Sequence, residues 1–158
     1  MRITLETFRL LNPKIGQLER STGGTPDLTY QEVADVLSGC TKPTSNYARY
    51  SYALDDTLRF KIVDAVTRRL LREDQARNRP ILPNQQHWKA VAELGVRLSR
   101  STVYLTASQK RIVTDLPRWT TRHEEALQNV RSLLDEWDYE LRCELGAWNR
   151  RLEDTTHG

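Results

Sequence analysis

The side chains in this sequence best suited to binding a ligand are arginines that cluster in the middle of the chain. One expected helix and the stretch after it carry the basic residues Arg59, Lys61, Arg68, Arg69, Arg72, Arg77 and Arg79. At about 100° per residue, Arg68, Arg72 and Arg79 fall on one side of that helix and Arg69 near its edge. Such a face can neutralise several phosphates of a nucleic acid. The alternative is that these arginines pair with the acidic last helix of the same molecule.

The formal net charge of +3 conceals an uneven distribution along the chain. Residues 1–58 carry a net charge of −1, residues 59–118 carry +8, and residues 119–158 carry −4. Of the 24 basic residues 19 are arginines, whose planar guanidinium suits phosphate, carboxylate and aromatic partners. This segregation predicts either pairing within the molecule or an oriented encounter with an oppositely charged partner.

A second candidate contact with nucleic acid lies between residues 42 and 52. Residues 29–37 resemble the first helix of a helix-turn-helix unit, and a helix from Tyr47 onward would then read the DNA. The expected turn, residues 38–45, is about twice the usual length of such a turn, which argues against this interpretation. Tyr52 lies off the apolar face of its neighbours and is a candidate for stacking on a base. The residues that would face nucleic acid here are Lys42, Asn46, Arg49 and Tyr52.

Patterns typical of metal sites and catalytic centres are missing from the sequence. The candidate metal ligands are not spaced two to four residues apart, as structural zinc sites require; they are Cys40, His87, His123, Cys143 and His157. There is no Gly-rich phosphate loop and no His-Glu-x-x-His motif. The acidic residues between 135 and 144 lie off the apolar face of the last helix and are expected to be a solvated surface. The sequence therefore predicts no metal, no cofactor and no enzymatic activity.

Length and composition are typical of a folded, soluble protein. The chain has 158 residues, of which 38% are hydrophobic and 28% charged, as in ordinary globular domains. No apolar run approaches the roughly 18 residues of a membrane span, and the N-terminus lacks the apolar core of a secretory signal. Two widely separated cysteines favour free thiols in a reducing compartment. We expect a cytoplasmic protein that does not associate with membranes.

Apolar periodicity predicts an all-α fold of five to seven helices. The expected helices cover residues 3–20 with a break near Pro13, 29–38, 47–78, 84–98, 106–116 and 121–152. Capping boxes mark three starts: Thr29 with Glu32, Thr106 with Gln109, and Thr121 with Glu124. We also expect Asn84 to cap a helix, Gly39 to end one in the left-handed conformation, and residues 41–46 to form a loop. In the helix from Thr106, the apolar residues are Ile112, Val113 and Leu116.

The last helix is the clearest element, and we expect it to be the spine of a helical bundle. Its apolar face consists of Leu127, Val130, Leu134, Trp137, Leu141, Leu145, Trp148 and Leu152. This spacing follows the period of a straight helix rather than a strict heptad, which favours a bundle helix over a supercoiled zipper. For the domains, we expect residues 1–40 to form a small helical lobe and residues 45–154 the main bundle, unless residues 1–158 form one continuous domain.

Charge and the missing catalytic motifs together indicate a binding protein. The leading hypothesis is a non-enzymatic accessory, inhibitor or adaptor protein that contacts another protein or a protein–nucleic-acid complex, of the kind that phages and other mobile elements encode. The alternative hypothesis is a DNA- or RNA-binding regulator that uses the helix-turn-helix-like segment and the basic face within residues 42–79. A third class is a structural subunit of a symmetric assembly.

Overall fold

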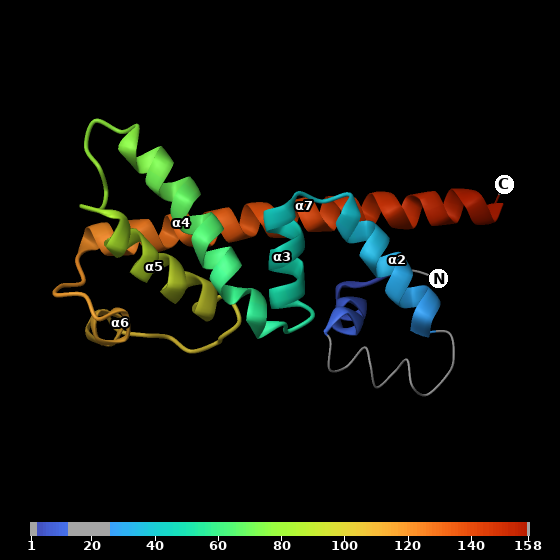
Figure 1. The fold of residues 1–158 in the computed structure, drawn as a ribbon, viewed down its shortest axis with the longest axis horizontal. Helices are drawn as coiled ribbons and strands as arrows, with labels where there is room; N and C mark the ends of the chain where they lie inside the picture. Colours follow the sequence, from blue (N-terminus) through green and yellow to red (C-terminus); the bar gives the residue numbers. More distant parts are fainter. Residues whose placement is uncertain (1–2, 13–25, 158) are drawn as a thin grey trace. The chain divides into compact units, whose positions relative to one another are not determined.

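The computed structural model describes residues 3–12 and 26–157, with side chains for residues 3–12 and 31–154 (Figure 1). These residues form helices and no strand, which confirms the all-α prediction with a long C-terminal helix. The elements are η1 (Leu5–Leu11), α2 (Pro26–Ser38), α3 (Lys42–Ser51), η2 (Asp56–Leu58), α4 (Arg59–Gln75), α5 (Gln85–Leu98), α6 (Ala107–Thr114) and α7 (Thr121–His157). No helix among the described residues is both long and apolar enough to cross a membrane. The second half of the predicted helix 3–20 lies outside the described residues.

The chain divides into two compact units that carry opposite charge. Unit 1 comprises residues 1–58 and 136–158, and unit 2 comprises residues 59–135, so α7 contributes to both. Unit 1 has 9 basic and 13 acidic side chains, whereas unit 2 has 15 basic and 8 acidic ones. The net charges are therefore −4 and +7. The predicted lobe 1–40 falls within unit 1, and its boundary near residue 40 stays a prediction.

Unit 1 buries apolar side chains from η1, α2, α3 and the C-terminal part of α7. Its core consists of Ile3, Phe8, Leu11, Val33, Val36, Leu37, Ala48, Ala53, Leu141 and Leu145. The amide of Asn149 on α7 fixes the N-terminal segment, because it accepts from the Ile3 N–H and donates to the Ile3 carbonyl, both at 3.0 Å. Two distant parts of the chain are thus joined by apolar packing and by a paired buried hydrogen bond.

Several predicted helix ends in unit 1 are wrong. α2 begins at Pro26, so Thr29 lies inside the helix rather than at its cap. Gly39 does not adopt a left-handed conformation; instead a Cβ there would lie 2.4 Å from Glu144 Oε1. Residues 42–46 are helical rather than a loop, because Pro43 sits in the first turn of α3, where its missing N–H costs nothing. The predicted helix 47–78 is interrupted at residues 52–58, where Leu54 has a φ of 59°.

Two acidic side chains of α7 hold α3, so the prediction that this acidic run is a solvated surface is wrong for them. Glu140 accepts from the Thr41 N–H at 2.9 Å and from the Thr44 hydroxyl at 2.6 Å. Asp138 accepts from the hydroxyls of Tyr47 at 3.2 Å and Tyr52 at 2.5 Å. Burial alone would raise the pKa of both carboxyls, but these hydrogen bonds lower it below the usual value, helped at Asp138 by a hydrogen bond from Arg142 and by the charge of Arg142.

Unit 2 packs α4 against α5, and α5 against α6, over the first part of α7. A buried carboxylate, Asp74, closes the connection between α4 and α5. It accepts from the N–H groups of Ile81 at 2.7 Å and Leu82 at 3.2 Å, and from the Trp88 indole at 2.9 Å. Asn84 caps α5 as predicted, since its side chain accepts from the His87 N–H. Leu127, Val130 and Leu134 of the predicted α7 face are buried in this unit.

Gly95 allows α5 to approach α7 closely. A Cβ at this position would lie 2.4 Å from Val130 Cγ1 and 3.3 Å from Leu127 Cδ1, both in fully buried residues. We expect Gly95→Ala to lower the free energy of unfolding by about 1–3 kcal/mol, although alanine is the better helix former. Urea unfolding followed by circular dichroism measures this change.

Gly146 is the matched control, because a Cβ there would meet only Arg150 Nη1 at 3.7 Å. We expect Gly146→Ala to leave the stability unchanged or to raise it by up to about 1 kcal/mol. Val130→Ala should recover part of the loss in the Gly95→Ala background. Equal effects of the two glycine substitutions would show that close packing at Gly95 is not the cause.

Candidate functional site

The helix α6 buries a single residue, a lysine, and exposes its two large apolar side chains. Lys110, at 7% exposure, is its buried residue. Ile112 and Val113 are instead 66% and 55% exposed. Just before the helix, Val103 and Tyr104 are 63% and 89% exposed. We call this stretch the 103–113 segment; of the three apolar residues 112, 113 and 116 that the sequence places in this helix, only Leu116 is buried.

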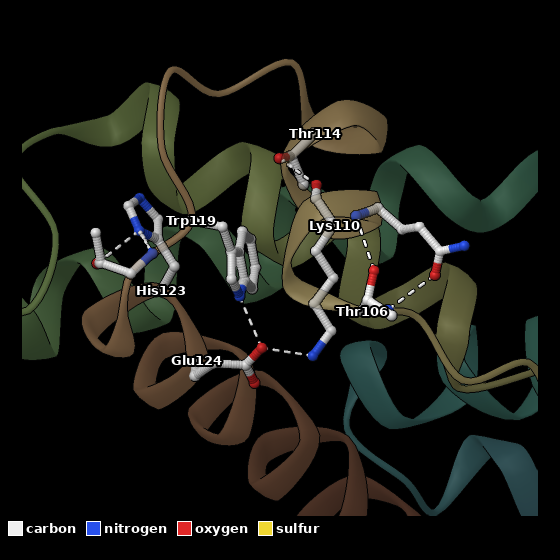
Figure 2. Close-up of polar contacts among 8 residues, drawn as sticks. Thr106, Lys110, Thr114, Trp119, His123 and Glu124 are labelled. Carbon is white, nitrogen blue, oxygen red and sulfur yellow. Dashed lines mark hydrogen bonds and ion pairs between the residues drawn. The ribbon is translucent and has the colours of Figure 1, made fainter.

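A cluster of polar and aromatic side chains holds α6 in this orientation (Figure 2). Lys110 Nζ donates to Glu124 Oε1 on α7 at 2.5 Å, and the Trp119 indole donates to the same oxygen at 2.7 Å. Burial alone would raise the pKa of Glu124, but the hydrogen bonds from Lys110 and Trp119 and the charge of Lys110 lower it. The buried cation is thus paired, and it anchors α6 through a lysine, a residue type that is usually exposed to solvent.

The start of α7 is capped by a histidine rather than by the predicted Thr121–Glu124 box. The Thr120 N–H donates to His123 Nδ1 at 3.1 Å, so this nitrogen carries no proton. The neutral ring therefore holds its proton on Nε2, which donates to His87 Nδ1 at 3.1 Å. The His123 ring also stacks on Trp119 with centroids 5.3 Å apart. Burial and the neighbouring His87 lower the pKa of His123.

A hollow of about 80 Å³ lies between α5 and α6, beside the 103–113 segment. Its lining consists of Ala90, Glu93, Leu94, Arg97, Val113 and Thr114. The Thr114 hydroxyl donates to the Lys110 carbonyl at 2.7 Å and is therefore turned back into the helix. Ala90, Leu94 and Val113 contribute aliphatic carbon to this recess, while Thr114 and the Glu93–Arg97 ion pair at 3.0 Å make the larger part of its exposed lining polar.

The sequence-predicted residues between 42 and 52 all fall in unit 1. Lys42, Asn46 and Arg49 occupy one side of α3 by spacing, but only Lys42 is exposed and the other two are half-buried. Tyr52 is half-buried, and its hydroxyl donates to Asp138. The connection between α2 and α3 spans only residues 39–41, so the predicted long turn is wrong and its length no longer argues against a helix-turn-helix unit.

The predicted basic residues between 68 and 79 fall in unit 2, whereas those between 42 and 52 fall in unit 1. Arg68 and Arg72 are exposed on α4, and Arg69 pairs with Glu73 on the same helix at 3.2 Å. α4 ends at Gln75, so Arg79 lies beyond it and does not share the helical face that the sequence predicted.

Of the candidate metal and thiol residues, His87 and His123 are in contact with each other. Among residues 3–12 and 26–157, no three His, Cys, Asp or Glu side chains are grouped as a metal site would need. Burial, Glu140 and Glu144 raise the pKa of the Cys40 thiol to about 11, which keeps it protonated at neutral pH. Comparison with protein-family models, curated proteins and solved structures finds no match for the chain.

Sequence reasoning missed the 103–113 segment, although the sequence contains a signal for it. The positions three and four residues before Ile112 and Val113 are the polar residues Ser108, Gln109 and Lys110, so within this helix their apolar spacing continues only to Leu116. Val103 and Tyr104 likewise stand in a polar stretch with no helical partner positions. Large apolar side chains without a periodic face are candidates for an exposed surface rather than for the core.

Proposed function

We propose that this chain is a non-enzymatic binding protein, of accessory, inhibitor or adaptor type, that contacts another protein through the 103–113 segment of unit 2. The observation that carries the proposal is the orientation of α6, which buries Lys110 and exposes Ile112 and Val113. Exposed groups of large apolar residues mark interaction sites in soluble proteins far more often than single ones do. We place this activity in the cytoplasm on account of the two isolated cysteines.

The composition of the segment suits a protein interface. Tyrosine is enriched among residues that dominate binding energy, and Tyr104 is the most exposed large residue of the segment. Its surroundings are basic: residues 97–118 carry four exposed arginines and one exposed acidic side chain, Asp115. An apolar centre with a charged border is the usual arrangement of such interfaces. The charged border would orient the encounter, and burial of the apolar side chains would supply the affinity.

The test is affinity capture from extracts of the cell that encodes the chain, with the full-length protein as bait. We expect Ile112→Asp with Val113→Asp to reduce recovery of the specific partner at least about tenfold. The matched control is Phe60→Asp with Tyr139→Asp, which changes two residues of similar exposure, 65% and 71%, outside the segment. Equal recovery with both double variants, or loss with the control alone, contradicts the proposal; circular dichroism confirms that each variant is folded.

Binding to nucleic acid is a second candidate function, and the exposed arginines of α4 favour it. Arg68 and Arg72 are one turn apart, and within the described part of the chain neither forms an ion pair. We expect random duplex DNA to bind at about 50 mM salt, with an affinity that falls steeply as salt rises. Arg68→Glu with Arg72→Glu should lower the salt slope by about 2.

The control for this measurement is Arg142→Glu in unit 1, which should leave the slope unchanged because Arg142 pairs with Asp138 at 2.6 Å. No binding at low salt removes this candidate. Binding that survives the double substitution shows that Arg68 and Arg72 are not the contact.

A further inference from the structure

We infer that the partner of the 103–113 segment presents an acidic peptide segment, one aliphatic side chain of which enters the hollow between α5 and α6. The inference rests on the proposed function and adds the chemistry of the partner. Three features of the structure carry it: the volume of the hollow, the residues of its wall, and the charges along its border.

The volume of the hollow fits a small aliphatic group. A cavity of about 150 Å³ accepts benzene, and a water molecule takes about 30 Å³ in the liquid. The hollow, at about 80 Å³, is therefore too small for an aromatic ring and matches the end of a valine, leucine or isoleucine side chain. Its wall contributes aliphatic carbon from Ala90, Leu94 and Val113 for that side chain to contact.

The border of the hollow is basic. On α5, Lys89, Glu93 and Arg97 lie at four-residue intervals, which places them along one ridge of the helix. Arg97 donates to Glu93 through Nη2 and remains half-exposed, so its other N–H groups can reach a carboxylate. On α6, Arg111 is exposed, and among the described residues neither Arg111 nor Lys89 forms an ion pair.

The same features favour an acidic peptide over a nucleic acid. Interfaces with DNA are more polar than interfaces with proteins. Here four large apolar side chains are exposed, those of Val103, Tyr104, Ile112 and Val113. A peptide with carboxylates beside an aliphatic anchor would satisfy both the basic border and the apolar centre, whereas a phosphate backbone would leave the apolar residues without partners.

The experiment is a selection of random peptides displayed on phage against the full-length protein, followed by affinity measurements on the enriched peptides. We expect the enriched peptides to combine several Asp or Glu residues with one Val, Leu or Ile. Val113→Trp, which fills the hollow from an exposed position, should weaken them at least about tenfold. Lys89→Gln with Arg111→Gln should do the same without changing a residue that lines the hollow, and added duplex DNA should not displace them.

Each outcome separates the inference from the proposed function. Peptides that require Ile112 and Val113 but carry no acidic preference, or that bind Val113→Trp unchanged, overturn the inference and leave the proposed function in place. A selection that yields no peptide dependent on the 103–113 segment counts against both. Displacement of the peptides by duplex DNA identifies the border as a phosphate site and also overturns the inference.

Discussion

Replacing Asp74 with alanine should lower the free energy of unfolding of unit 2 by about 3–5 kcal/mol. The carboxylate is 2% exposed, and it accepts from two backbone N–H groups and from the Trp88 indole. Alanine would leave all three donors without a partner in a place that water does not reach. Each such orphaned buried donor costs about 1–3 kcal/mol, which together is a large part of the stability of an ordinary domain.

Urea unfolding and hydrogen exchange together measure this effect. The amides of Ile81 and Leu82 should lose protection first, because they donate directly to Asp74. Glu73→Ala is the matched control: its carboxylate is half-exposed, pairs with Arg69, and should matter by less than about 1 kcal/mol. Similar losses for the two variants would mean that the loop after α4 has another anchor.

Acidification from pH 7.5 to 5 should destabilise unit 2 through His123. Burial and His87 lower the pKa of His123 in the folded protein below its ordinary value of about 6.5. The unfolded chain therefore binds the proton first, so stability is complete above about pH 6.5 and is lost as pH falls through the folded pKa. In structural terms, a proton on His123 Nδ1 would face the Thr120 N–H that this nitrogen now accepts from.

His123→Gln tests this explanation, because glutamine at the third helical position can still accept from the Thr120 N–H but does not titrate. We expect urea unfolding at a series of pH values to show a decline between about pH 7 and 5 for the wild type and a flat response for the variant. The carboxyls with lowered pKa, Glu124, Asp138 and Glu140, act in a separate window below about pH 4.5. An unchanged decline in His123→Gln would assign the pH dependence to another group.

The sequence correctly predicted features that depend only on residues close together in the chain, such as helix caps and the apolar face of a helix. The Thr106–Gln109 capping box and the Asn84 cap were correct because each is made within a few residues. The buried face of α7 was correct because its period repeats over many turns, down to Leu145. Thr120 caps α7 instead of Thr121, since His123 supplies an acceptor that the usual capping motif does not include.

The candidate site depended on partners distant in sequence, and for that reason it was not predicted. Lys110 is buried because it donates a hydrogen bond to Glu124 and lies over the ring of Trp119. Helical periodicity in the sequence does not predict these contacts. The roles of Asp138 and Glu140 depend in the same way on hydroxyls and an amide some ninety residues earlier. The predicted nucleic-acid contacts at residues 42–52 and 68–79 stay predictions, now divided between two units of opposite charge.

The anchoring of α6 by Lys110 has a consequence for how this surface can change over time. In most short helices, apolar side chains hold the helix against the rest of the protein. A substitution of such a side chain that changes which partner is bound therefore also risks unfolding the helix. Here the anchor is a cation on one side, and Ile112 lies on the other. Substitutions at the exposed positions can therefore alter what is bound while the fold is kept, which makes the segment suited to rapid divergence alongside an evolving partner.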